Sequence, residues 1–149
     1  METSASAIWQ NNRVILCHFD SYSTALVFAR WPSGSLLAPE PLPASAQPME
    51  APQNVANLSG EMITQAAINT LGIGDKELHY TNDYQAWVAS DAGPTRVHLL
   101  RFTTLDAPPE RIEAQGGVFK PLSALRGAAQ IELGLLRKVF DLIMSGGGK

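Results

Sequence analysis

The chain has 149 residues, of which 45% are hydrophobic and 17% charged, and this composition is sufficient for one globular domain with a buried core. Its 11 basic and 14 acidic residues give a formal net charge of -3 without any run of lysine or arginine, which argues against nucleic acid or an anionic membrane as a partner. The single cysteine, Cys17, excludes an internal disulfide bond, and no stretch approaches the roughly 20 apolar residues of a membrane-spanning helix. Residues 1–4 lack the basic and apolar character of a signal peptide, so we expect a cytoplasmic protein. We expect one domain over residues 1–144, followed by a disordered tail at residues 145–149.

The first predicted elements are two strands, residues 13–19 and residues 25–31, joined by the polar residues 20–23. This pattern predicts a β-hairpin. The apolar run in the first strand is nearly continuous, which is typical of a central strand covered on both faces. Cys17 and His18 are adjacent in this strand, so their side chains point to opposite faces and cannot form a thiol–imidazole pair. We expect a buried thiol and a hydrogen-bonded or half-exposed imidazole.

A proline-rich stretch follows at residues 32–57 and carries six of the ten prolines. Proline has no N–H and restricts the residue before it, so neither a helix nor a central strand can continue through this stretch. We therefore predict a long loop, which is typical either of a functional lid or of a mobile insertion.

The next stretch, residues 59–73, is the helix that the sequence defines best. Ser59 can accept a hydrogen bond from a free N–H of the first turn, and Glu61 places a negative charge at the positive end of the helix dipole. Gly72 can adopt the left-handed conformation that ends a helix. The face expected to pack on the sheet consists of Met62, Ile63, Ala66 and Ala67.

The second half of the chain reads as strands followed by a closing helix. The predicted strands are residues 77–80, 84–89, 96–102 and 118–120, with a turn at residues 91–94 and a short helix or turn at residues 121–125. We expect the first three of these strands to form a meander. The final helix, residues 128–144, has an apolar arc that covers more than half of its circumference, which predicts packing in the core or against a partner and favours a homodimer.

Three short segments carry a resemblance to a known family. Gly60 and Glu61 open the well-defined helix, residues 71–73 close it as Leu-Gly-Ile, and a Phe-Lys-Pro-Leu segment at residues 119–122 precedes the last helix. With a hairpin before the helix and strands after it, this order of elements resembles the Nudix hydrolase superfamily. The resemblance implies an α+β fold, an α/β/α sandwich in which a Nudix-like mixed sheet is packed between helices. It covers most of the chain in element order, whereas the residue matches are confined to these segments.

The catalytic signature of that family is incomplete in this chain. In that family the signature has a first glutamate and then seven intervening residues. Arg-Glu, an aliphatic residue, a spacer and a pair of glutamates follow. Here Glu61 stands at the first glutamate, and Asn69, Thr70 and Leu71 stand at the Arg, Glu and aliphatic positions, but the paired glutamates are absent. Hydrolysis of the Nudix kind needs several carboxylates on one helix to hold Mg²⁺, which neutralises the diphosphate and activates water. A lone Glu61 cannot provide such a site, so we predict no metal and no cofactor.

The candidate functional residues are few. Glu61 is the candidate catalytic residue, and Glu113, Phe119 and Glu132 are the candidates for ligand binding. We expect Glu113 and Glu132 to be solvated charges or local caps, because they are not spaced to share a metal ion.

Two hypotheses about function remain open at this point. The chain is either a Nudix-like domain that has lost catalysis and binds a small molecule, a nucleotide or another protein, or a divergent Nudix-type phosphohydrolase that acts on a nucleoside diphosphate derivative with a rearranged metal site. We favour the first hypothesis, because loss of the paired glutamates removes the metal site and leaves the sheet and helices intact. Mg²⁺ is expected only under the second hypothesis.

Overall fold

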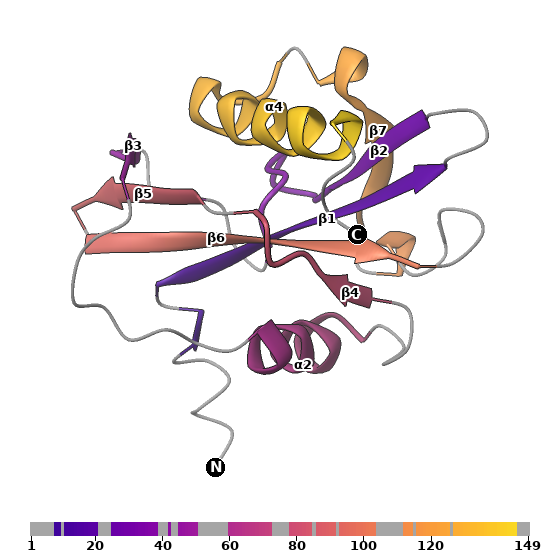
Figure 1. Ribbon diagram of the computed structural model, residues 1–149, viewed down its shortest axis with the longest axis horizontal. Helices are drawn as coiled ribbons and strands as arrows, with labels where there is room; N and C mark the ends of the chain where they lie inside the picture. The colour runs from indigo at the N-terminus through magenta and orange to yellow at the C-terminus, as the bar shows by residue number, and fades with distance from the viewer. Residues whose placement is uncertain are drawn as a thin grey trace.

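The computed structural model has α+β architecture, with a mixed sheet between helices that lie on its opposite faces (Figure 1). It describes residues 8–9, 11–20, 25–38, 42, 45–50, 60–72, 78–84, 86–91, 93–103, 112–114, 116–125 and 127–145. The strands are β1 (Asn12–Asp20), β2 (Ala25–Arg30), β3 (Gln47–Met49), β4 (Leu78–Tyr80), β5 (Ala86–Ser90), β6 (Gly93–Phe102) and β7 (Val118–Pro121). The helices are α2 (Gly60–Leu71) and α4 (Gln130–Met144), with a 3-10 turn, η1 (Leu122–Ala124), after β7.

Strand β1 is central in the sheet, whose order is β3-β5-β6-β1-β2-β7. It pairs antiparallel with β2, with Cys17 opposite Phe28, and parallel with β6, with Asn12 opposite Arg96. The other edge of β6 pairs antiparallel with β5 near its start and with β4 near its end. The predicted hairpin and the predicted central position of the first strand are therefore confirmed.

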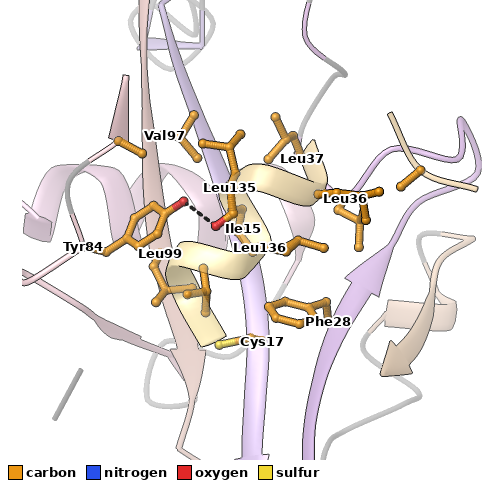
Figure 2. Packing of buried hydrophobic residues seen from close by; sticks show 14 of the residues in the cluster. Ile15, Cys17, Phe28, Leu36, Leu37, Tyr84, Val97, Leu99, Leu135 and Leu136 are labelled. Carbon is orange, nitrogen blue, oxygen red and sulfur yellow. Dashed lines mark hydrogen bonds between the residues drawn. The ribbon is translucent and has the colours of Figure 1, made fainter. Parts of the chain in front are cut away.

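Helix α4 covers one face of the sheet and buries the larger apolar cluster (Figures 1 and 2). Leu135 and Leu136 on the helix face Ile15 and Phe28 on the sheet, and all four side chains are buried. Burying one such side chain stabilises the fold by about 1.5–3 kcal/mol. Tyr84 also packs here, and its hydroxyl donates to the Leu135 carbonyl oxygen at 3.0 Å, which gives the polar end of this ring a partner inside the core.

Helix α2 covers the opposite face through a second apolar cluster (Figure 1). Its buried side chains are Ile63, Ala66, Ala67 and Leu71, and they pack with alternate residues of β1 and β6, among them Val14, Leu16 and Leu100. The helix ends as predicted, since Gly72 has a φ of 68° and its N–H donates to the Ile68 carbonyl oxygen at 2.9 Å. Among the helices in the described ranges, none has both the length and the apolar character needed to cross a bilayer.

Three expectations from the sequence are wrong. The proline-rich stretch contains β3, a three-residue strand that tolerates Pro48 because it lies at the edge of the sheet. The predicted meander is not formed, since β4 pairs with β6 and not with β5. Met62 does not join the buried face of α2 and is 51% exposed. Some predicted features lie outside the described residues. They are the cap Ser59, the remainder of the proline-rich stretch at residues 39–41, 43–44 and 51–57, and the tail beyond residue 145.

The width of the apolar arc on α4 exceeds what the sheet covers. Val139 and Ile143 are buried against the sheet, whereas Phe140 and Met144 on the outward side are 39% and 40% exposed. The arc therefore has a buried side and an exposed side, and the expected homodimer stays a prediction.

Candidate functional site

The candidate site is a group of polar and aromatic side chains on the face of the sheet that α2 covers in part. Three of them form a row across neighbouring strands: Asn12 on β1 lies opposite Arg96 on β6, and Arg96 lies opposite Trp87 on β5. His98 follows Arg96 by two residues on β6, so both side chains point to the same face. Strand alternation and pairing thus bring an amide, a guanidinium, an indole and an imidazole together.

A chain of hydrogen bonds runs from Tyr80 on β4 through His98 to Asn12. Tyr80 Oη is 2.6 Å from His98 Nδ1, and His98 Nε2 is 2.7 Å from Asn12 Oδ1. The Asn12 amide nitrogen donates to the Ile8 carbonyl oxygen at 2.9 Å and to Asn11 Oδ1 at 3.1 Å. Because Nδ2 is the only donor of this side chain, these two bonds fix the orientation of the amide, and Asn12 Oδ1 must accept from His98 Nε2.

His98 is therefore a neutral imidazole whose Nδ1 accepts the hydrogen of the Tyr80 hydroxyl. The His98 side chain is fully buried, and this burial, together with the positive charge of Arg96, lowers the pKa of His98 to about 3. Burial also raises the pKa of Tyr80, and Arg96 opposes that shift. At neutral pH this chain of bonds carries no charge, and it holds the Tyr80 hydroxyl in one orientation.

The start of α2 lies directly against the ring of Tyr80. A Cβ atom at Gly60 would come within 2.4 Å of a Tyr80 ring carbon, so only glycine permits this close approach. Gly60, one of the residues that carry the resemblance, has a packing role here. It allows α2 to pack directly against the ring of Tyr80, whose hydroxyl bonds to His98.

Arg96 is the charged member of the group. Its guanidinium carbon lies 6.0 Å from the centroid of the Trp87 ring, within the range of a cation–π contact, and both side chains are partly exposed. Its Nε is buried, and in the described part of the chain no acceptor bonds to it. Within the same described ranges Arg96 forms no ion pair with a carboxylate. The buried Nε therefore has an unused donor on a partly exposed side chain, and an anion that reached it would supply an acceptor.

The residues that the sequence singled out are not brought together. Glu61 is exposed in the first turn of α2, and Glu113 is exposed in the short turn at residues 112–114. Phe119 packs edge-to-face on Phe102 with ring centroids 5.7 Å apart, as part of the cluster beneath α2. The expectation for Phe119 as a ligand-binding residue stays a prediction.

The expectation for Glu132 is wrong in one respect, because it is neither solvated nor a cap of its own helix. The side chain is 5% exposed and accepts hydrogen bonds from Ser35 Oγ at 2.7 Å and from the Leu36 N–H at 2.9 Å. These donors belong to the segment that follows β2, so Glu132 ties that segment to α4. Since α4 and α2 cover opposite faces of the sheet, Glu132 and Glu61 do not belong to one site (Figure 1).

Sequence reasoning missed the group formed by Tyr80, Trp87, Arg96 and His98. One local signal was present, because Arg96 and His98 alternate with apolar residues in a strand and so share a face. Their contact with Asn12 depends on the pairing of β1 with β6, and the contact with Tyr80 depends on the pairing of β4 with β6. Local patterning indicates neither pairing.

In the described ranges no three or more His, Cys, Asp or Glu side chains lie close enough to hold a metal ion. Comparison with known proteins finds no family model that matches this chain and no curated protein that matches it.

Proposed function

We propose that this chain is a Nudix-like binding module for a small anionic molecule, which Arg96 holds on the face of the sheet that α2 covers in part. The observation that supports the proposal is the half-buried Arg96 guanidinium, which rests on Trp87 and has no carboxylate partner in the described part of the chain. A bound anion would supply the missing partner, and charge-assisted hydrogen bonds from guanidinium groups are among the strongest in proteins.

Two features favour binding over hydrolysis. The sequence between Glu50 and Asp75 contains Glu61 as its only acidic residue, and Mg²⁺ needs well-placed carboxylates to offset the loss of its waters. His98 is a poor general base at neutral pH, because its pKa is lowered to about 3 and its Nδ1 already accepts from Tyr80.

A divergent phosphohydrolase with a rearranged metal site is the competing function, and activity assays separate the two. A panel of nucleoside diphosphate derivatives is incubated with the protein and Mg²⁺ or Mn²⁺, and phosphate release is measured. We expect no turnover above the background of the Glu61→Gln variant. Robust turnover that Glu61→Gln abolishes would overturn the proposal.

A titration with Mn²⁺ tests the metal directly. We expect no selective broadening of amide signals in residues 59–73, because Thr64 and Gln65, one turn after Glu61, are neutral and leave an ion with a single charged ligand. Site-specific broadening at micromolar Mn²⁺ that is lost in Glu61→Gln contradicts this expectation.

A further inference from the structure

The chain of hydrogen bonds at the site restricts what Tyr80 can offer a ligand. Because His98 Nε2 donates to Asn12, its Nδ1 can only accept, and the hydrogen of the Tyr80 hydroxyl is committed to it. The Tyr80 oxygen, on a half-buried side chain, keeps lone pairs but has no hydrogen to donate elsewhere. A ligand that bonds to this oxygen must therefore carry an N–H or O–H donor.

Arg96 and Trp87 add two further requirements. The guanidinium is a cation with a planar set of donors, which matches a carboxylate or a phosphate group. The Trp87 ring contacts this guanidinium, so the partly exposed indole lies beside an anion bound there. A flat ring next to the anion would bury more surface there than a bulky aliphatic group, since aromatic pairs prefer stacked or edge-to-face contact.

Arg96 and Tyr80 lie to either side of His98 along β6, since Arg96 precedes His98 by two residues and Tyr80 pairs with Leu100, two residues after it. Arg96 and His98 are two residues apart on one strand, about 7 Å between Cα atoms, and Tyr80 Oη lies 2.6 Å from His98 Nδ1. The positive charge of Arg96 also acts on the hydroxyl of Tyr80, opposing the rise in its pKa that burial causes.

Resting on the binding function proposed above, we infer that the site takes a small aromatic oxyanion, a carboxylate or phosphate joined to a flat ring that bears an N–H or O–H donor. Arg96 binds the oxyanion, Trp87 contacts the ring, and Tyr80 accepts from the donor. His98 and Asn12 are positioning residues, which fix the direction of the Tyr80 hydroxyl without touching the ligand.

The test is a titration followed by nitrogen–proton correlation spectra, which report the Arg96 Nε–H and the Trp87 indole N–H separately. The probes are acetate, inorganic phosphate, cyclohexanecarboxylate, benzoate, phenyl phosphate and meta-hydroxybenzoate. We expect both signals to shift with benzoate or phenyl phosphate, and the comparison of these two probes decides between the carboxylate and the phosphate. Benzoate should bind about two- to tenfold tighter than cyclohexanecarboxylate, and the hydroxyl of meta-hydroxybenzoate should add a similar factor.

Variants assign each preference to its residue. Arg96→Gln should weaken binding of every anion by about tenfold to a hundredfold, whereas Arg137→Gln, which removes an exposed guanidinium from α4, should leave binding unchanged. Trp87→Leu should abolish the preference for benzoate over cyclohexanecarboxylate. Tyr80→Phe should abolish the gain from the hydroxyl and leave benzoate affinity within about twofold. Urea unfolding of each variant verifies that it is folded at the temperature of the titration.

The outcomes distinguish this inference from the function on which it rests. Binding of anions through Arg96 with no preference for a flat ring or a donor would overturn the ligand class and leave the binding module in place. Affinities that Arg96→Gln does not change would overturn both. Arg96-dependent binding with the predicted order of probes supports both.

Discussion

Lowering the pH from about 8 to about 4 should destabilise the protein by about 3 kcal/mol through His98 alone. In the native state, burial and the charge of Arg96 lower the pKa of His98 to about 3, whereas an imidazole in the unfolded chain has its ordinary pKa of 6.5. The unfolded chain therefore binds a proton at a pH where the native state does not. The stability that neutral His98 contributes is fully present above about pH 6.5 and is lost as the pH falls towards about 3.

The magnitude follows from the distance between the ordinary pKa and the final pH. From 6.5 to about pH 4 is about two and a half units, and each unit corresponds to about 1.4 kcal/mol, so the loss is slightly more than about 3 kcal/mol. The structural cause is specific, because a protonated imidazole would be a buried charge and would add a second positive charge near Arg96.

Urea unfolding followed by tryptophan fluorescence, at both pH values, measures this loss. Carboxylates also titrate in this range. The quantity of interest is therefore the loss of stability in the wild type minus the loss in His98→Gln, because all other titrating groups are present in both proteins. The wild type should lose about 3 kcal/mol more than His98→Gln. The control His79→Gln removes an exposed imidazole from β4, keeps His98, and should lose as much as the wild type. Equal losses in the wild type and His98→Gln would refute the neutral, buried imidazole.

Three further outcomes are expected. Glu132→Ala should lower the free energy of unfolding by about 1–3 kcal/mol, because two buried donors lose their acceptor. Glu132→Gln keeps one acceptor oxygen and should lose less. Equal losses in urea unfolding would contradict this. Gly60→Ala should lower the free energy of unfolding by about 1–3 kcal/mol, since the new methyl group meets the Tyr80 ring. Gly134→Ala, where a Cβ meets open space in the middle of α4, should raise it by about 1 kcal/mol. A rise in melting temperature for both variants would show that Gly60 is not in close contact. Sedimentation at micromolar concentration should reveal a homodimer, because Phe140 and Met144 leave apolar surface exposed on α4; a 16 kDa species alone contradicts it.

Much of the local structure could be predicted, because its causes lie within a few residues. The nearly continuous apolar run in residues 13–19 predicts a central strand, and β1 is central. The end of α2 at Gly72 follows from the conformational freedom of glycine, and the observed φ of 68° confirms it. The error at Met62 shows the limit of this reasoning, since helical spacing gives the relative directions of side chains but not the angle at which the helix meets the sheet.

The candidate site could be predicted only in part. That Arg96 and His98 share a face of a strand follows from the period of two along the chain. That His98 is fully buried and bonded to both Tyr80 and Asn12 does not, because these partners lie 18 and 86 positions away in sequence. Glu132 illustrates the same limit, since its donors Ser35 and Leu36 are 97 and 96 positions away.

By itself the sequence determined most of the elements, the end of the best-defined helix at Gly72 and the presence of Glu61 as the single acidic residue between Glu50 and Asp75, all of which depend on neighbouring residues. Only the tertiary structure decided that β1 lies parallel to β6, that β4 and β5 share one edge of β6, and that Arg96 rests on Trp87 without a carboxylate partner in the described ranges. The physical reason is that parallel pairing has no connecting turn to mark it in the sequence, and that burial and charge pairing arise where distant segments meet.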